Sequence, residues 1–338
     1  MLRTAEHVLD LIGETALLRI PSLSRLTGSE IFLKCEFQNP GGSVKDRTAL
    51  GLVREAMERG ELRPGMTIVE GTAGNTGIGL AIVAKALGFK LLVVMPKGQT
   101  PEKERMIRLH GAELLLVDAC PFKDPKHFYH TARRIAEEHP SSHWWANQFE
   151  NLANFRAHYT TTGPEIWEQM GGRVDALVSA AGSGGTIAGT SRALKERDPK
   201  IEVVLADPYG SGLKSFVETG EFKSEGSSIT EGIGIMRLVA NFAEARVDRA
   251  LKVSDRSLVT LSRYLRDQDG IVLGSSSALN AVAALQTALR LGPGKRIVSF
   301  ACDLGERSYS KLYQDDFLRQ QGIEVDSLSI EELLAKQA

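Results

Sequence analysis

One lysine lies where a helix is predicted to begin, directly behind a Pro-Gly-Gly turn. The segment reads Asn39-Pro40-Gly41-Gly42-Ser43-Val44-Lys45-Asp46-Arg47, and Ser43 is the predicted N-cap. A cation is unfavourable in the first turn because the helix dipole is positive there. The position of Lys45 makes sense if its amine is neutral and nucleophilic, ready to form an imine with a cofactor aldehyde. The alternative is an ordinary surface lysine with charged neighbours.

Two glycine-rich loops have the composition of anion-binding sites. Each stands between a predicted strand and a predicted helix, and their sequences are Glu70-Gly71-Thr72-Ala73-Gly74-Asn75-Thr76-Gly77-Ile78-Gly79 and Ala181-Gly182-Ser183-Gly184-Gly185-Thr186. In front of a helix, backbone N–H groups and the helix dipole attract a carboxylate or phosphate without any added charge. Residues 181–186 suit one phosphate group. For residues 70–79, a turn that serves only tight packing is the alternative.

A run of three serines follows a short apolar stretch in the segment Gly274-Ser275-Ser276-Ser277-Ala278. A serine here could cap the helix predicted over residues 276–291, or it could donate a hydrogen bond into a site. The residues alone favour neither role.

Other ligand-binding motifs are incomplete in this sequence. A dinucleotide fingerprint needs GxGxxG and an acidic residue about 20 residues later. Ile187 occupies the last glycine position of one loop, and no carboxylate ends the strand that follows the other. The Gly294–Lys295 pair continues with arginine, so it is no Walker loop. No HExxH motif occurs, and we interpret His127 and His130, on one predicted helix face, as solvated residues. No metal site is predicted.

Apolar runs and amphipathic helical patterns alternate along most of the chain, and these elements must position the four segments. Short apolar runs between helices indicate parallel strands covered on both faces. Because eight even strand–helix units cannot be counted, we predict an α/β protein with two doubly wound sheets. Such sheets bind ligands beyond the carboxyl ends of their strands. The predicted strands are 31–36, 66–70, 90–95, 113–117, 175–180, 201–206 and 296–300, and the predicted helices are 46–59, 75–87, 101–110, 126–138, 186–197 and 276–291.

Length and charge narrow the class of protein. The chain has 338 residues, which suits two α/β domains. Its 41 Lys and Arg and 42 Asp and Glu residues nearly cancel, so neither nucleic acid nor an anionic membrane is an expected partner. No apolar run approaches the ~18 residues of a membrane-spanning helix, and the N-terminus has no signal-peptide pattern. Cys35, Cys120 and Cys302 are far apart and are predicted to be buried free thiols in a reducing cytosol.

Taken together and in this order, the four segments resemble the cysteine synthase and cystathionine β-synthase family of fold-type II enzymes, which use pyridoxal 5′-phosphate (PLP). The family's lysine segment is NPGGSVKDR, which residues 39–47 reproduce. Its T-S-G-N-T-G, G-T-G-G-T and G-I-S-S-G loops correspond to residues 72–77, 182–186 and 274–278. Further similar stretches are residues 147–149, 161–167 and 303–307, and the resemblance covers about residues 8–315.

The resemblance implies how the cofactor is held. Lys45 would bind PLP and move the α-proton of the substrate. Asn75 would hydrogen-bond the phenolic oxygen of the cofactor, and Ser276 would contact its pyridine nitrogen. The phosphate would be bound by Gly182, Ser183, Gly184, Gly185 and Thr186.

A serine at the pyridine nitrogen fits one reaction type. In many PLP enzymes a carboxylate keeps this nitrogen protonated and makes the ring a deep electron sink. The hydroxyl of Ser276 cannot enforce that proton, which favours loss of a β-leaving group over the reprotonation that transamination requires. We therefore predict β-elimination and β-replacement through an aminoacrylate, which a thiol or sulfide can attack.

The substrate side departs from the family pattern. Ala73 replaces the usual serine, Ala278 replaces a glycine, and residues 228–237 keep only the central Gly-Ile-Gly. Gly232 lies in that last segment, which borders the β-substituent and the nucleophile in the family. The substrate carboxylate would be received by Thr72, Ala73, Asn75, Thr76 and Gln148.

The resemblance predicts a cysteine synthase that forms cysteine and acetate from O-acetylserine and sulfide. The alternatives are a cystathionine β-synthase, a sulfide-releasing cysteine desulfhydrase or, further away, serine or threonine dehydratase and threonine synthase. A catalytically inactive sensor that only keeps the fold is the alternative from another class, and the intact Lys45 segment argues against it.

The resemblance also suggests a homodimer, a complex with serine acetyltransferase and a cytoplasmic location. The expected domains are a smaller one over residues 45–155 and a larger PLP-binding one over residues 8–44 plus 156–315. A tail of unassigned role follows over residues 316–338.

Overall fold

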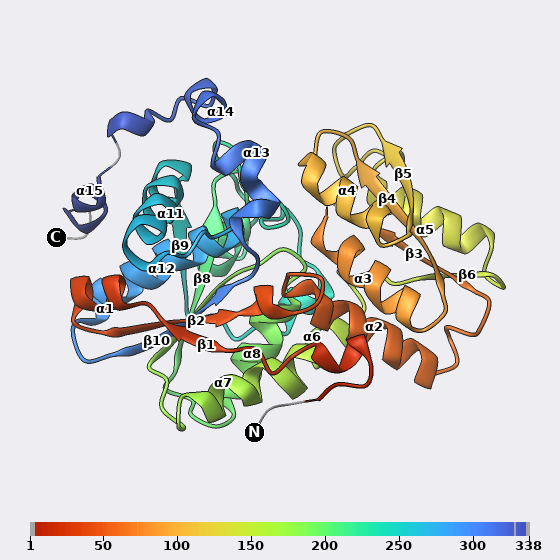
Figure 1. Ribbon diagram of the computed structural model, residues 1–338, viewed down its shortest axis with the longest axis horizontal. Coiled ribbons are helices and arrows are strands. Elements are labelled where there is room, and N and C mark those ends of the chain that lie inside the picture. Colours follow the sequence, from red (N-terminus) through yellow and green to blue (C-terminus); the bar gives the residue numbers. More distant parts are fainter. Residues whose placement is uncertain (1–3, 73, 328, 336–338) are drawn as a thin grey trace.

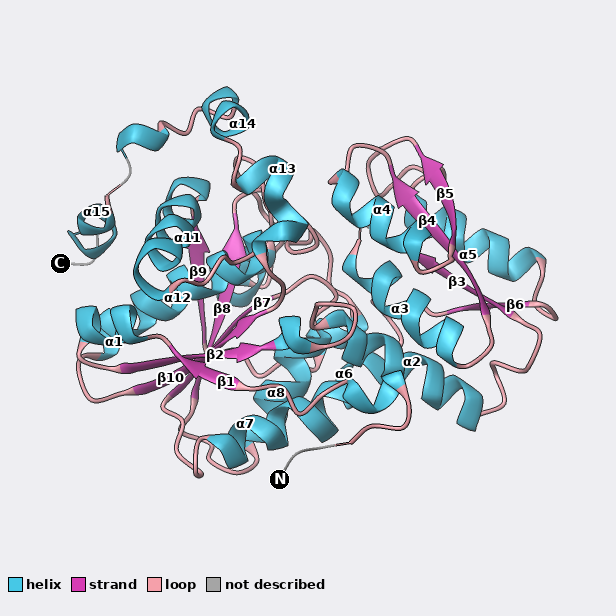
Figure 2. Ribbon diagram, in the orientation of Figure 1, coloured by secondary structure: helices cyan, strands magenta, loops and turns pink. Residues whose placement is uncertain are grey.

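Two sheets of unequal size organise the chain into two lobes (Figure 1). The computed structural model describes residues 4–72, 74–327 and 329–335. Figure 2 shows helices on both faces of each sheet. None of the described helices is both long and apolar enough to cross a membrane.

The larger lobe is built on six strands in the order β1-β2-β10-β7-β8-β9. All neighbours are parallel except β1 and β2, which pair antiparallel at one edge. The strands are β1 (Leu17–Arg19), β2 (Glu30–Cys35), β7 (Ala176–Ala180), β8 (Glu202–Pro208), β9 (Arg249–Val253) and β10 (Arg296–Ala301).

The smaller lobe has four parallel strands in the order β5-β4-β3-β6. They are β3 (Thr67–Gly71), β4 (Lys90–Pro96), β5 (Glu113–Val117) and β6 (His143–Trp145). This sheet therefore comes from one continuous stretch of chain, whereas the larger sheet combines strands from before and after it.

Helices connect the strands and cover the sheets. The α-helices are α1 (Pro21–Thr27), α2 (Lys45–Glu58), α3 (Asn75–Ala86), α4 (Pro101–Leu109), α5 (Phe128–Glu138), α6 (Ala153–Ala157), α7 (Gly163–Gln169), α8 (Gly185–Lys195), α9 (Leu213–Thr219), α10 (Ala240–Ala243), α11 (Asp255–Asp269), α12 (Ser275–Leu291), α13 (Tyr309–Leu312), α14 (Asp315–Gln320) and α15 (Ile330–Ala335). Short 3-10 turns span Val8–Leu11, Glu36–Gln38, Gly305–Ser308 and Val325–Ser327, and a π-helical turn, His158–Thr162, joins α6 to α7.

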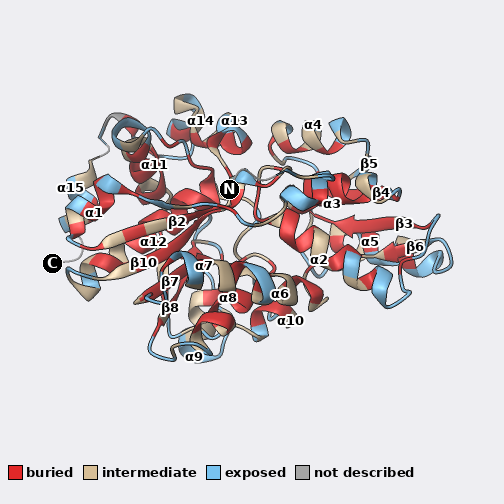
Figure 3. Cartoon of the chain, turned by 60° about the horizontal axis from the view of Figure 1, so that its bottom comes forward, coloured by how far each residue is buried: buried red, intermediate tan, exposed pale blue. Residues whose placement is uncertain are grey.

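Burial follows from this layering. The central strand β7 is buried along its whole length, and α12, which packs on β10 and β7, is buried on nearly all sides. Figure 3 shows buried residues along the strands and exposed residues on the outer faces of the helices. A short apolar run without alternation is the pattern that a strand covered on both faces requires.

The predicted fold class is confirmed. All seven predicted strands and all six predicted helices are present, with ends within two residues of the prediction. Three strands were missed, namely β1, β6 and β9. Two of these have only three residues, and in β1 two of the three are exposed, so their sequences carry almost no periodic signal.

The C-terminal tail packs on the larger lobe. Leu318 and Leu333 are buried in the core that also contains residues of α11 and α12. Arg256 binds Glu332 in the tail at 3.1 Å, and Arg263 binds Asp315, directly before the tail, at 2.5 Å, so both ion pairs join this end of the chain to α11. The tail thus covers one side of the larger core, away from the smaller lobe (Figure 1).

Candidate active site

A cavity of about 380 Å³ lies between the two lobes, at the carboxyl ends of β3, β7 and β10. This is the edge at which parallel α/β sheets bind ligands. Eleven of the predicted site residues line it: Lys45, Thr72, Asn75, Thr76, Gln148, Gly182, Ser183, Gly184, Thr186, Gly232 and Ser276. Gly185 is not among the lining residues, and Ala73 lies outside the described residues.

The segment before α2 is held by hydrogen bonds and ion pairs to near neighbours and to distant parts of the chain. The side-chain amide of Asn39 donates to the backbone and the carboxylate of Glu36, and Gly41 N donates to Asp46. Arg47 forms ion pairs with Glu36 and Glu165, both at 2.7 Å. These contacts fix the start of α2 and with it the position of the preceding turn.

Ser43 is not the N-cap residue that we predicted. Val44 precedes the helix, although Ser43 Oγ accepts a hydrogen bond of 3.3 Å from Lys45 N. The turn places the Ser43 hydroxyl one residue before the N-cap position, a difference no larger than the one or two residues by which assignments of helix ends differ.

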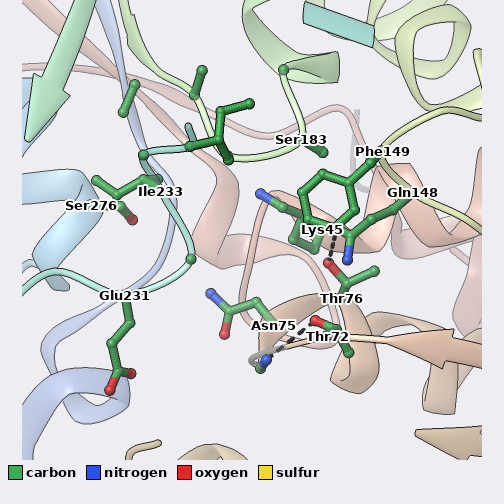
Figure 4. Close-up of a pocket in the computed structure, with 18 of the residues that line it drawn as sticks. Lys45, Thr72, Asn75, Thr76, Gln148, Phe149, Ser183, Glu231, Ile233 and Ser276 are labelled. Atoms are coloured by element: carbon green, nitrogen blue, oxygen red, sulfur yellow. Dashed lines mark hydrogen bonds between the residues drawn. The ribbon is translucent and has the colours of Figure 1, made fainter. Parts of the chain in front are cut away.

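Burial lowers the pKa of the Lys45 amine from its usual value, against the opposing attraction of Asp303 and Glu36. A lowered pKa increases the fraction of neutral amine, which is the nucleophilic form. Figure 4 shows Lys45, Asn75 and Ser276 facing the same space. The surface-lysine alternative is therefore wrong.

Asn75, at the start of α3, reaches across to the larger lobe. Its Nδ2 donates to Asp303 Oδ2 at 2.7 Å, whereas its Oδ1 is buried and has no hydrogen-bond partner within the described chain. A buried polar atom without a partner costs free energy. This atom is therefore a candidate contact for a bound group.

Two further residues of the loop after β3 are oriented by hydrogen bonds. Thr76 Oγ1 donates to Gln148 Oε1 at 2.7 Å (Figure 4), and Gln148 N donates to Glu70 Oε1 at 3.4 Å. Burial raises the pKa of Glu70 to about 8. A protonated Glu70 adds no negative charge behind the loop predicted to receive a carboxylate.

The loop after β7 forms a close-fitting cradle. A Cβ on Gly182 would lie 2.2 Å from Gly232 O, and one on Gly185 would lie 2.1 Å from Asn154 Oδ1. Asn154 Nδ2 also donates to Ser183 Oγ at 2.9 Å. Because α8 begins at Gly185, the backbone N–H groups of its first turn are available to an anion.

His158, in the π-helical turn, lies behind this cradle. Its Nε2 is 3.2 Å from Thr186 Oγ1, and burial together with the cations Arg47 and Lys45 lowers its pKa well below the usual value. The imidazole is therefore neutral. The cradle can attract a phosphate through N–H groups, hydroxyls and the helix dipole, without a histidine cation.

The three serines at the start of α12 have different environments. Ser277 Oγ donates to Asp303 O at 2.7 Å and accepts from Asp303 N at 3.1 Å, so this hydroxyl is committed to the backbone. Ser276 instead lines the cavity. No described serine side chain caps α12, whose N-cap residue is Gly274, so the capping alternative is wrong. Ser276 remains the candidate for a contact within the site.

Two predictions about individual side chains were wrong. His127 is not on a helix face, because α5 begins at Phe128. It caps that helix through Nδ1 and lines the cavity. Cys120 and Cys302 are only partly buried, and Cys302 also faces the cavity. Burial in that region raises the pKa of Cys302 to about 12, which keeps the thiol neutral.

Three charged residues at the cavity were not singled out from the sequence. Glu231 and Arg237 stand on either side of the Gly-Ile-Gly stretch, and Lys103 lies on α4. No sequence pattern pointed to these three residues, because the side chains with which they interact are far away in the sequence. Glu231 pairs with Lys103 at 2.6 Å and with Lys311 at 2.5 Å.

Comparison with known proteins agrees with this geometry. The sequence profile of one family, described as "Pyridoxal-phosphate dependent enzyme", matches residues 8–303. The chain belongs to this family. The family resemblance found in the sequence is confirmed, and so is PLP as the cofactor of the enzyme.

Relatives cover nearly the whole chain. "Cysteine synthase 2" of Schizosaccharomyces pombe is 48% identical over 334 residues, covering 93% of this chain and 85% of the relative. A crystal structure of an "O-acetylserine dependent cystathionine beta-synthase from Helicobacter pylori" has a TM-score of 0.84 and 33% identity, covering 93% of this chain and all of that one. A "hydrogen sulfide-producing enzyme" of Fusobacterium nucleatum has a TM-score of 0.82 and 31% identity, covering 90% and 99%.

The residues of this PLP enzyme fit its cofactor. The cradle at Gly182 and Gly185 has room only for small residues, as close approach of a phosphate to the backbone requires. The buried Asn75 Oδ1 lacks a partner, and the Lys45 amine has a lowered pKa. Within the described chain, no cluster of three or more His, Cys, Asp or Glu side chains could hold a metal ion.

Proposed function

We propose that this protein is a cysteine synthase that forms cysteine and acetate from O-acetylserine and sulfide by β-replacement. The observation that carries the proposal is the single cavity that joins the Lys45 amine to two uncharged anion-binding loops, one after β3 and one after β7. Curated relatives over nearly the whole chain that bear the name cysteine synthase support it.

PLP, when bound, would supply the electron withdrawal that weakens the bonds at the substrate α-carbon. Lys45 would hold the cofactor and then use its Nζ to take the α-proton. Ser276 would face the pyridine nitrogen as a neutral group, and Asn75 would orient the ring. The phosphate would be bound by residues 182–186.

The loop after β3 would orient the amino-acid substrate. Its hydroxyls and amides, with the Gln148 side chain that Thr76 already contacts, would receive the carboxylate. Holding the carboxylate fixes the α-C–H bond relative to Lys45, and such positioning accounts for much of the rate of a proton transfer. Gly232 would border the β-substituent. The residues proposed for the carboxylate are Thr72, Ala73, Asn75, Thr76 and Gln148.

A sulfide-releasing or cystathionine-forming enzyme is the second candidate. It is favoured by the altered segment 228–237 and by the two similar solved structures, which are of a cystathionine beta-synthase and of a hydrogen sulfide-producing enzyme. Both candidates use the same residues for the first half of the reaction, so the difference lies in the donor and the nucleophile.

Several further properties belong to this proposal. We infer a homodimer, a cytoplasmic location and a complex with serine acetyltransferase from the family resemblance. The domain boundaries at residues 45, 155 and 315 are proposed on the same ground.

A steady-state panel tests the function. O-Acetylserine, serine, cysteine and O-phosphoserine are assayed as donors, with sulfide and homocysteine as nucleophiles. We expect O-acetylserine with sulfide to give the highest kcat/KM. If cysteine is consumed fastest with release of sulfide, the protein is a desulfhydrase and the cysteine synthase proposal is wrong.

The variant Ala73→Ser sharpens this test. One additional charge-assisted hydrogen bond is worth about 1.5–3 kcal/mol, so KM for O-acetylserine should fall by about tenfold or more with little change in kcat. Loss of activity in this variant would instead mean that Ala73 makes room for a bulkier donor.

A further inference from the structure

The cations that face the cavity differ in whether they are free to bind an anionic group. Among the described lining residues they are Lys45, Lys103 and Arg237. Lys45 is committed to the cofactor in the proposed function. The other two lie on the side of the cavity formed by residues 231–237, where the β-substituent of the donor would lie.

Arg237 is enclosed by aromatic rings and one carboxylate. Its guanidinium stands over Phe122 at 4.5 Å, over Tyr129 at 5.0 Å and over Phe149 at 5.4 Å. Its Nη1 forms an ion pair with Glu150 Oε1. The rings restrict the approach to the guanidinium faces, and the carboxylate cancels the charge.

Glu150 is itself fixed in place. Its second oxygen, Oε2, accepts a hydrogen bond of 2.8 Å from Ala240 N. A carboxylate with one oxygen on the backbone and the other on a guanidinium does not readily turn away when a ligand arrives. The neutralisation of Arg237 is therefore built into the site.

Lys103 is also engaged by a carboxylate, which it shares with a second lysine. Its Nζ binds Glu231 Oε2 at 2.6 Å, and both side chains are less than 10% exposed. Glu231 also binds Lys311, on its other oxygen, so the carboxylate is fully engaged. The remaining lining of this side includes Phe122, Tyr129, Phe149, Ile233, Ile235 and Met236. It also includes His127, whose pKa is lowered by burial, so the imidazole adds no charge at pH 7.

We infer that Glu150 is a specificity-determining residue, which cancels the charge of Arg237 and thereby makes this side of the cavity selective for an uncharged β-substituent. This inference rests on the proposed function and names the donor class within it. An acetyl ester is uncharged, whereas a phosphate ester carries about −1.5 to −2 charges at pH 7 and needs a free cation when it leaves water. The site thus accepts an O-acyl serine and disfavours an O-phospho serine.

The variant Glu150→Gln isolates this effect, because it removes the charge and keeps both the shape and an acceptor for Ala240 N. The kcat/KM of O-acetylserine divided by that of O-phosphoserine, both with sulfide, should fall by about tenfold or more, since a freed guanidinium forms charge-assisted bonds to phosphate. The double variant Glu150→Gln/Arg237→Gln should restore the ratio of the parent.

Glu244→Gln is the matched control. Glu244 pairs with Arg192, whose guanidinium stands over the Phe155 ring at 5.8 Å, and neither charged residue lines the cavity. This variant removes the same kind of interaction elsewhere in the larger lobe and should leave the ratio unchanged.

A binding measurement separates this inference from the proposed function. Inorganic phosphate is titrated into the PLP-loaded protein and its Kd is read from the cofactor absorbance. Phosphate should bind at least about tenfold more tightly to Glu150→Gln than to the parent or the control. If the parent uses neither donor but the phosphate shift occurs, the function is wrong and the charge cancellation stands. Preference of the parent for O-phosphoserine, or an unchanged phosphate Kd, would overturn the inference.

Discussion

Two segments beside the cavity, residues 39–47 and residues 228–237, are held in place in opposite ways. The first is fixed by buried contacts with near neighbours, such as Asn39 with Glu36 and Gly41 with Asp46, and by contacts with the rest of the larger lobe, such as Arg307 with Gly41 O. The second hydrogen-bonds to the larger lobe, as Gly234 N does to Ala181 O, but its charged side chains reach the smaller lobe. Glu231 contacts Lys103, and Arg237 contacts the rings of Phe122 and Tyr129. The difference separates the segment proposed to do the chemistry from the segment proposed to select the substrate.

A rigid segment suits the lysine, because a nucleophile must keep its position through every step. A segment anchored to the opposite lobe suits substrate selection, because its geometry depends on how closely the lobes approach. Changes in the first segment should therefore abolish activity or stability, and changes in the second should alter KM.

Lys45→Ala should have the largest effect. Without the amine there is no lysine-bound cofactor and no group to take the α-proton. The visible absorbance of the lysine-bound cofactor and all β-elimination should be lost. A lysine adduct reducible by borohydride elsewhere in this variant would show that the assignment of Lys45 is wrong.

Arg47→Met should have the second-largest effect, and it should lower the free energy of unfolding more than it weakens ligand binding. Glu36 is fully buried, and breaking a buried pair by removing one partner costs about 3–5 kcal/mol. Urea unfolding monitored by fluorescence measures the loss. Arg108→Met, which breaks an exposed pair with Glu104 at 3.2 Å, is the control and should change stability by less than about 1 kcal/mol.

Asp46→Asn should remove a pH dependence of the protein's stability that arises in the first segment, residues 39–47. Burial raises the pKa of Asp46 from 3.8 to about 7. Between these two pH values the Asp46 carboxyl is ionised in the unfolded chain but protonated in the folded chain. The contribution of this carboxyl to the free energy of unfolding is therefore lost as the pH rises through about 7. The free energy of unfolding of Asp46→Asn minus that of the parent should be higher at pH 8 than at pH 5, by about 1–3 kcal/mol. Equal urea midpoints of parent and variant at both pH values would contradict this.

Lys103→Met should have the smallest effect and should appear in KM. It breaks the ion pair of Glu231 with the smaller lobe and leaves only the hydrogen bond of 3.2 Å from Thr100 Oγ1, whereas Lys311→Met breaks the ion pair within the larger lobe. We expect KM for the donor to rise by about tenfold in the first variant, or ~1.4 kcal/mol, with kcat nearly unchanged. A similar rise in Lys311→Met would mean that Glu231 needs both partners, and the comparison between the segments would lose its basis.

Much of the fold and of the site could be predicted because their signals are local. Strands such as β7 are covered on both faces and have unbroken apolar runs, and the loops proposed to bind anions follow such strands directly. Side chains whose partners are distant in sequence could not be predicted. In the sequence, Arg237 resembles an ordinary surface arginine. Only the fold brings it into contact with the Phe122 ring and the Glu150 carboxylate. The helix cap His127 was misinterpreted because α5 begins at Phe128, two residues after its predicted start.

The order of the strands has a consequence for synthesis of the chain. The four strands of the smaller sheet are contiguous, so that lobe can form as soon as residue 145 has left the ribosome. Strand β2, in contrast, pairs with β10 on its inner side and has only the short β1 on the other. Until residues 296–301 are made, β2 presents an unpaired apolar edge, and such edges aggregate. We expect nascent chains that stop before β10 to be the species that most need a chaperone.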